Sequence, residues 1–113
     1  MSEHPDCLFC KIVSGQIPTD KVAEDEHAIV FKDISPQAPT HLLIIPKVHV
    51  TNVAEVTDPA VFSQVLAMAQ KTAKSLGLEN FRLAINNGAG AGQSVFHLHV
   101  HLLSGRTFHW PPG

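Results

Sequence analysis

The stretch Phe96-His97-Leu98-His99-Val100-His101-Leu102 alternates apolar side chains with histidines. In an extended strand successive side chains point to opposite faces, so the three imidazoles are expected on one face and the apolar side chains on the other. Strict alternation of this kind is typical of a strand rather than a helix. We therefore predict a strand from Ser94 to Leu103, with one face packed and the other available for chemistry.

Length and composition limit the organisation of the chain. It has 113 residues, of which 44% are hydrophobic and 16% charged, and this predicts one compact domain over residues 1–113. The net charge of −2 and the scattered Lys and Arg residues argue against a nucleic-acid partner. No apolar run approaches the roughly 20 residues that span a bilayer, and no leader pattern opens the chain. We expect a cytoplasmic protein with no membrane partner.

The other expected elements surround this strand. The apolar spacing that follows Thr57, Asp58 and Pro59 predicts one long helix ending at Gly77. A short helix and four further strands are expected at 8–13, 21–24, 28–32, 42–45 and 81–85. Because the helices do not alternate with the strands, we predict an α+β fold with a five-stranded antiparallel sheet, one long helix and one short helix.

Three histidines on one face of a strand could form an exposed polar face or a metal site. The residues before them favour a third interpretation, a site for an anion. Asn86-Asn87-Gly88-Ala89-Gly90-Ala91-Gly92-Gln93-Ser94 is rich in glycine, which lets backbone N–H groups approach an anion. Gln93 and Ser94 add side-chain donors. The loop leads into a strand and not a helix, which excludes the Rossmann and Walker patterns. Together with the histidines, it predicts a phosphate site.

Histidine suits nucleophilic chemistry at phosphorus. Its usual pKa near 6.5 leaves a neutral ring available at pH 7. Attack on phosphorus would give a phosphorylated imidazole that water can cleave, so two easier steps replace one hard step. The nucleophilic ring needs a fixed tautomer, which a neighbouring carbonyl or histidine can supply.

Several segments resemble one protein family. His97-Leu98-His99-Val100-His101-Leu102-Leu103 is similar to the motif of the histidine triad (HIT) nucleotide-binding proteins. The segments 33–41, 92–95 and 109–113 extend the likeness, and the last, His109-Trp110-Pro111-Pro112-Gly113, is typical of the Hint branch. The resemblance implies the HIT-like fold and a homodimer whose two sheets join into one ten-stranded sheet, with a nucleotide site in each subunit.

The resemblance also implies catalytic roles. His99 would be the nucleophile that takes up the nucleotidyl group. The main-chain carbonyl of His101 would orient that ring, while the ring of His101 approaches the phosphate. His97 completes the triad and His41 supports the network, and the hydroxyl of Ser94 would contact the phosphate and the leaving group.

Nucleotide contacts follow from the same resemblance. Asp33 would accept both ribose hydroxyls, as an ionised carboxylate can only accept hydrogen bonds. Asn86 would contact ribose or phosphate, and Gly92 and Gln93 would lie against the α-phosphate. An apolar slot for either purine would be formed by Leu8, Phe9, Ile12, Phe31 and Ile34, for each of which plain core packing is the alternative.

The reaction implied is hydrolysis of purine nucleoside 5′-phosphoramidates, and of aminoacyl-adenylates, to a nucleoside monophosphate, with no cofactor required for catalysis. Relatives that transfer nucleotidyl groups to sugars carry Gln at the position of His101, so histidine there favours hydrolysis. Two alternatives stay open: a non-catalytic purine-nucleotide-binding regulatory protein, and a Fhit-like dinucleoside polyphosphate hydrolase.

The two cysteines form a separate motif. Cys7 and Cys10 have a spacing common in zinc sites, and His49 with one triad histidine could complete a tetrahedron. By resemblance to relatives with a structural zinc ion, that histidine would be His97. The alternatives are two unligated cysteines beside the base slot and a redox pair.

Overall fold

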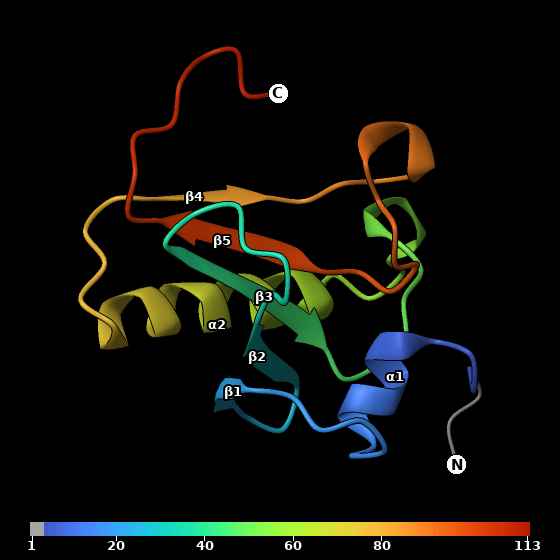
Figure 1. Cartoon of the computed structure of the whole chain (residues 1–113). Coiled ribbons are helices and arrows are strands. Elements are labelled where there is room, and N and C mark those ends of the chain that lie inside the picture. Colours follow the sequence, from blue (N-terminus) through green and yellow to red (C-terminus); the bar gives the residue numbers. More distant parts are fainter. Residues whose placement is uncertain (1–3) are drawn as a thin grey trace.

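The computed structural model describes residues 4–113 as an α+β fold built on one five-stranded antiparallel sheet of order β1-β2-β3-β5-β4 (Figure 1). The strands are β1 (Lys21–Glu24), β2 (Ala28–Lys32), β3 (Thr40–Pro46), β4 (Phe81–Ala84) and β5 (Val100–Ser104). The helices are α1 (Leu8–Val13) and α2 (Ala60–Ser75), with single 3-10 turns at Val53–Glu55 and Ala89–Ala91. The predicted fold class is confirmed.

The long helix α2 covers one face of the sheet (Figure 1). It begins one residue later than predicted, and the Asp58 carboxylate accepts the N–H of Ala60 at 3.0 Å. Gly77, at φ +69°, follows its last turn. Its buried stripe packs against alternate side chains of the sheet, and this core includes Val65, Met68, Ala69, Val30, Leu42, Ile44, Val100 and Leu102.

The opposite face of the sheet is also packed. The short helix α1 contributes Phe9 and Ile12 to a second buried cluster with Ile29, Phe31, Leu43 and Ile45. Strand β3 is therefore buried on both faces, which explains its continuous apolar run. The expectation that only one face packs is wrong, because the histidine side of the sheet is covered by α1.

The histidine strand is shorter than predicted. β5 begins at Val100 and not at Ser94, because its pairing stops there. The ladder with β3 ends at Ile44 and Val100, although β3 itself continues to Pro46, and β4 ends at Ala84, opposite His101. Before that point the chain leaves the sheet, and the N–H of Leu98 donates instead to the carbonyl of Val50 at 2.7 Å. Phe96, expected on the packed face, is about half exposed. Alternation alone could not reveal where the pairing with the partner strands stops.

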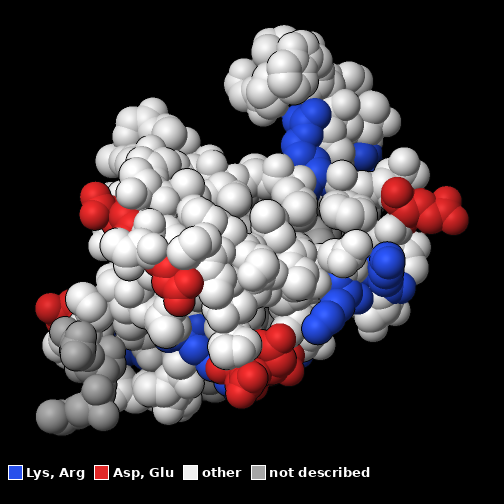
Figure 2. Space-filling model, turned by 180° about the vertical axis from the view of Figure 1, so that it is seen from behind, with Lys and Arg blue, Asp and Glu red and all other residues white. Residues whose placement is uncertain are grey.

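Within residues 4–113, no helix is long and apolar enough to cross a membrane. On the face seen in Figure 2, basic and acidic side chains lie interspersed, without a continuous stripe of one sign. Several of the molecule's charged groups form surface pairs, such as Lys47 with Glu24 at 2.8 Å.

Candidate functional site

His99 lies just before β5 with its ring almost fully buried. Its Nδ1 is 2.8 Å from the main-chain oxygen of His97. Because a carbonyl oxygen can only accept, Nδ1 carries the ring proton and Nε2 keeps its lone pair. The edge of Phe9 packs against the ring, with 5.1 Å between ring centroids. The structure thus gives His99 the tautomer that a nucleophile acting through Nε2 needs.

The carbonyl that orients His99 is not the one expected. The resemblance assigned this role to His101, and the structure assigns it to His97. His101 pairs with Leu43 on one side and Ala84 on the other, so it lies inside the sheet. Residue 97 precedes the strand, and its carbonyl is available to a side chain two residues later.

His101 and His41 form an ordered pair of imidazoles on adjacent strands. The backbone N–H of Gln37 donates to Nδ1 of His41 at 3.0 Å, which places the His41 proton on Nε2. That nitrogen lies 2.9 Å from Nδ1 of His101 and donates to it. His101 therefore carries its own proton on Nε2. The ring of His101 lies beside that of His99, at a centroid distance of 5.0 Å.

Burial keeps His101 neutral. Desolvation, reinforced by repulsion from His99 and His41, lowers the pKa of His101 to about 4. Near neutral pH its ring has one N–H donor and one acceptor nitrogen, as the hydrogen-bond pattern requires.

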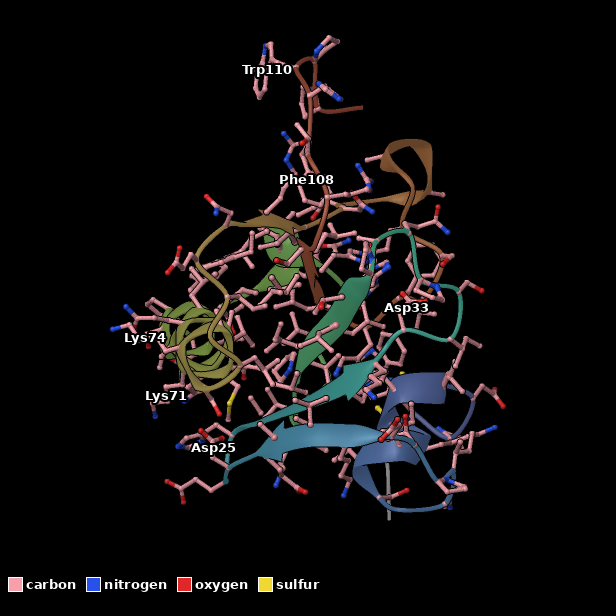
Figure 3. The ribbon with its side chains drawn as sticks, turned by 60° about the vertical axis from the view of Figure 1, so that its left-hand side comes forward. Asp25, Asp33, Lys71, Lys74, Phe108 and Trp110 are labelled. Carbon is pink, nitrogen blue, oxygen red and sulfur yellow. The ribbon has the colours of Figure 1, made fainter. Side chains whose placement is uncertain are left out.

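Asp33 lies in the loop between β2 and β3 (Figure 3). Its Oδ1 accepts the N–H of Ser35 at 2.7 Å, and its Oδ2 is 3.4 Å from Nε2 of His41. A carboxylate has about four acceptor sites, so further hydrogen bonds remain available at this group. The structure thus brings Asp33 into the same network as His41 and His101.

The glycine-rich loop is held together largely by its own bonds. Within it the N–H groups of Ala91, Gly92 and Gln93 donate to loop carbonyls. The buried side chain of Gln93 accepts the N–H of Gly88 at 2.8 Å and donates to the carbonyls of Thr51 and Val95. A phosphate contact by Gln93 would cost these bonds, so its amide shapes the loop in this structure.

Three other loop residues were predicted to contact the nucleotide. Gly92 has a φ of +100°, which favours glycine, and a Cβ added there would lie 3.5 Å from the side-chain nitrogen of Asn86. Asn86 is half-buried, and Ser94 is exposed. The hydroxyl of Ser94 is thus the accessible donor where the loop leads toward the triad.

The five residues expected around the base fall into two groups. Phe9, Ile12 and Phe31 are buried in the core cluster beneath α1, as the alternative interpretation held. Leu8 is 42% exposed and Ile34 is 96% exposed. Of the five residues, Leu8 and Ile34 are therefore the two that a ligand could reach.

Cys7, Cys10, His49 and His97 form one compact group, which we call the metal cluster. Their four ligand atoms all lie within 4.8 Å of one another. The Cys10 sulfur is 3.3 Å from Nδ1 of His49, and Nδ1 of His97 is 3.5 and 3.6 Å from the two sulfurs. Ordinary zinc bond lengths in a tetrahedron separate sulfur and nitrogen ligands by about 3.6 Å. The donor set and its spacing fit a structural zinc ion.

The protonation of His97 is the one that a zinc ligand needs. Its Nε2–H donates to the carbonyl of Pro46 at 2.8 Å, which leaves Nδ1 deprotonated toward the sulfurs. Desolvation lowers the pKa of this fully buried ring to about 4, and burial also lowers that of His49. Neutral imidazole is the form that binds metal.

Asp33, His41 and His101 also bring three ligand atoms together. Here Nε2 of His41 must carry a proton, because its Nδ1 already accepts from Gln37. A metal at Nε2 would require either an imidazolate or loss of that bond. This second group is therefore suited to passing hydrogen bonds and not to holding a cation.

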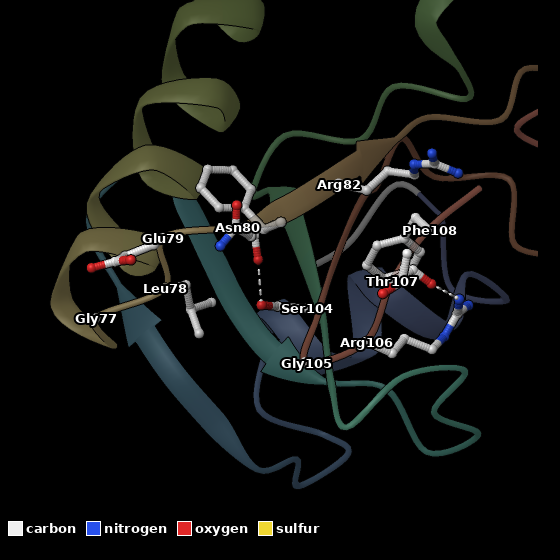
Figure 4. A pocket seen from close by; sticks show the side chains of 11 residues that line it. Gly77, Leu78, Glu79, Asn80, Arg82, Ser104, Gly105, Arg106, Thr107 and Phe108 are labelled. Carbon is white, nitrogen blue, oxygen red and sulfur yellow. Dashed lines mark hydrogen bonds between the residues drawn. The ribbon is translucent and has the colours of Figure 1, made fainter. Parts of the chain in front are cut away.

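A pocket of about 850 Å³ lies away from the triad, beside the ends of β4 and β5 (Figure 4). Its wall includes Phe108, which has Arg106 over its ring at 4.2 Å and Arg82 at 5.2 Å. None of the three triad histidines lines it. Pocket size therefore does not identify the candidate site, which is defined by its hydrogen bonds.

Sequence reasoning missed the backbone groups that set the protonation of the rings. These are the carbonyls of His97 and Pro46 and the N–H of Gln37. Every residue has a backbone, so residue type does not indicate which backbone N–H or carbonyl will bond to a histidine ring. The one available signal was that Gln37 lies inside the 33–41 segment that carried part of the resemblance.

Comparison with known proteins gives a consistent result. The profile of the HIT domain matches residues 14–108. An uncharacterized HIT-like protein of Synechocystis is 48% identical, over 96% of this chain and 97% of its own. A 14 kDa zinc-binding protein of Zea mays is 47% identical, over 94% of this chain and 87% of its own. The crystal structure of a HIT family hydrolase from Legionella pneumophila superposes with a TM-score of 0.91 at 48% identity, covering 96% of this chain and 100% of that one.

Proposed function

The chain belongs to the HIT domain family, and from this premise we propose that it hydrolyses purine nucleoside 5′-phosphoramidates through a nucleotidyl intermediate on His99. The observation that carries the proposal is the hydrogen bond from Nδ1 of His99 to the carbonyl of His97. It leaves the Nε2 lone pair free in a ring whose edge contacts are Phe9 and His101. This arrangement supports attack on phosphorus.

In the first proposed step, Nε2 of His99 attacks the α-phosphorus and forms an N–P bond. The bond from phosphorus to the amine nitrogen breaks, and that nitrogen takes up a proton from solvent so that a neutral amine departs. Nε2–H of His101 can donate to a phosphate oxygen, because its Nδ1 is occupied by His41. In the second step, the oxygen of a water molecule bonds to phosphorus and its proton goes to solvent, while the N–P bond breaks. The nucleoside monophosphate is released and Nε2 of His99 regains its lone pair.

We place the nucleotide between the exposed apolar pair and the polar network. The purine lies against Leu8 and Ile34, with Phe9, Ile12 and Phe31 behind them in the core. Asp33 accepts the ribose hydroxyls, since its oxygens have lone pairs beyond those used by Ser35 and His41. Around the phosphate lie Ser94, Gly92 and Asn86, with Gln93 holding the loop.

We further propose that two copies join through β4 into the ten-stranded sheet. β4 ends the strand order and therefore has a free edge. Phe81 and Leu83 on this strand and Leu66 on α2 are partly exposed, and all three line one shallow pocket. An apolar surface beside an unpaired edge favours a second copy of the chain.

Turnover of a fluorogenic adenosine 5′-phosphoramidate tests the proposed reaction. We expect His99→Ala to lower kcat by about 10⁴-fold or more, because the covalent route is lost. His27→Ala is the matched control, since this exposed ring lies in the turn between β1 and β2, with its Nε2 3.1 Å from Glu26. Full activity in His99→Ala would contradict the proposal. Binding of AMP without turnover in the wild type would favour a regulatory protein, and faster cleavage of a diadenosine polyphosphate would favour the Fhit-like reaction.

A further inference from the structure

His97 belongs to both the metal cluster and the candidate active site. Its ring contacts both cysteine sulfurs through Nδ1 and the Pro46 carbonyl through Nε2–H. Its main-chain oxygen accepts the proton of His99. One residue therefore connects the cluster to the ring that would bond phosphorus.

The cluster also holds α1 against the triad. Cys7 is the N-cap of this helix, and its sulfur accepts the N–H of Cys10 at 3.4 Å. Between the two cysteines lies Phe9, whose ring contacts those of His97 and His99 edge-on at centroid distances of 5.9 and 5.1 Å. A helix of six residues is unstable alone, so its position depends on what anchors it.

Without a metal, weak thiol contacts join the cluster: Cys10 lies 3.3 Å from Nδ1 of His49, and Cys7 lies 3.5 Å from Nδ1 of His97. A neutral thiol is only a weak hydrogen-bond donor, so these contacts hold the four side chains loosely. A tetrahedral ion satisfies all four ligands at once. Metal binding should therefore restrict α1 and the His97 backbone, both of which contact His99.

We propose that metal binding at Cys7, Cys10, His49 and His97 is positively coupled to nucleotide binding at His99. The coupling passes through the His97 carbonyl and through Phe9 on α1. It rests on the proposed function, since it requires a nucleotide at this site. Cys7, Cys10 and His49 are then positioning residues, which act on the nucleotide through His97 and the helix.

Thermodynamic linkage makes this coupling measurable from both sides. Typical couplings between sites change an affinity by about 5- to 150-fold, and the factor must be equal in both directions. We expect AMP to bind at least about fivefold more tightly to the zinc-loaded chain than to the chelator-treated chain. Saturating AMP should tighten Zn²⁺ binding, measured against a chelating dye, by the same factor.

The state of His99 gives a readout that needs no turnover. ¹⁵N spectra of the histidine rings should show the Nδ1–H tautomer of His99 in the zinc-loaded chain and a mixture of tautomers after metal removal. If far-UV circular dichroism shows that the metal-free chain unfolds, the comparison uses the variant His49→Ala in its place. This variant lacks one ligand and keeps Cys7, Cys10 and His97. His27→Ala is the control and should leave both affinities unchanged.

The outcomes separate this coupling from the proposed function. Equal AMP affinity with and without zinc, and an unchanged His99 tautomer, would overturn the coupling while AMP binding itself upholds the nucleotide site. Absence of AMP binding in both forms would contradict the proposed function and the coupling together. Matching factors from the AMP and Zn²⁺ titrations support the coupling.

Discussion

The molecule contains two groups of buried histidines a few residues apart, and they are suited to different tasks. In the metal cluster, Nε2–H of His97 donates to a carbonyl and the other nitrogen is left as a lone pair. In the pair of His41 and His101, a backbone N–H donates to His41, so the proton moves to the nitrogen that faces His101. Burial lowers the pKa of both His97 and His101 to about 4. Two rings with similarly lowered pKa values thus have different chemistry, because the hydrogen-bond partner of each second nitrogen differs.

The largest effect should appear in metal content. Purified without chelator, the chain should carry about one zinc ion, because the cluster offers four suitable ligands. Cys10→Ser and His97→Ala should lower that ratio well below one, whereas His41→Ala should leave it unchanged. Elemental analysis by mass spectrometry measures the ratio. Loss of zinc in His41→Ala would contradict the distinction between the two groups.

Removing His41 should break the other group. His41→Ala deprives Nδ1 of His101 of its donor, and an unsatisfied buried acceptor costs about 1–3 kcal/mol. We expect the free energy of unfolding in urea to fall by that amount and phosphoramidate turnover to fall with it. His27→Ala, at an exposed ring, serves as the control. An unchanged free energy of unfolding would show that the pair is not a stabilising contact.

Acid should weaken the fold through His101. Its folded pKa of about 4 lies below the usual histidine pKa of 6.5, so between these values the unfolded state binds more protons and stability falls as pH falls. The loss should be on the order of 1–2 kcal/mol, because solvent screens a half-buried ring. Urea titrations at pH 7, 5.5 and 4 measure it, with the cluster kept metal-free. An equally steep loss in His101→Asn would assign the effect to other groups.

The smallest effect concerns Asp33. Asp33→Asn keeps an oxygen for the N–H of Ser35 but loses the charge and one acceptor. We expect AMP to bind about fivefold more weakly, which corresponds to about 1 kcal/mol, and the preference over 2′-deoxy-AMP to shrink. Isothermal titration of both nucleotides tests this expectation. Undiminished discrimination would remove Asp33 from the ribose site.

Much of the architecture was predictable because it depends on local patterns. The hairpin of β1 and β2 follows from two short runs around Asp25, whose Oδ1 accepts the N–H groups of His27 and Ala28 at 2.8 Å. The long helix follows from apolar spacing between Pro59 and Gly77. In both places a few adjacent residues determine the backbone.

The start of β5 was not predictable, because it depends on where its pairing with β3 stops and where β4 ends. The same holds for the carbonyl that orients His99, since any residue type supplies a carbonyl. The four residues of the metal cluster were named from the sequence, and their convergence depends on the packing of α1 against the segment before β5. The residues of the site could therefore be named from the sequence, whereas the backbone groups that bond to their side chains could not.

The most direct measurement is rapid quenching of the wild-type chain during turnover of adenosine 5′-phosphoramidate, followed by peptide mass spectrometry. The account predicts an adenylyl group on His99, formed fast enough to precede release of AMP. An adenylyl group on another residue, or steady turnover with no modified peptide at any quench time, would contradict it.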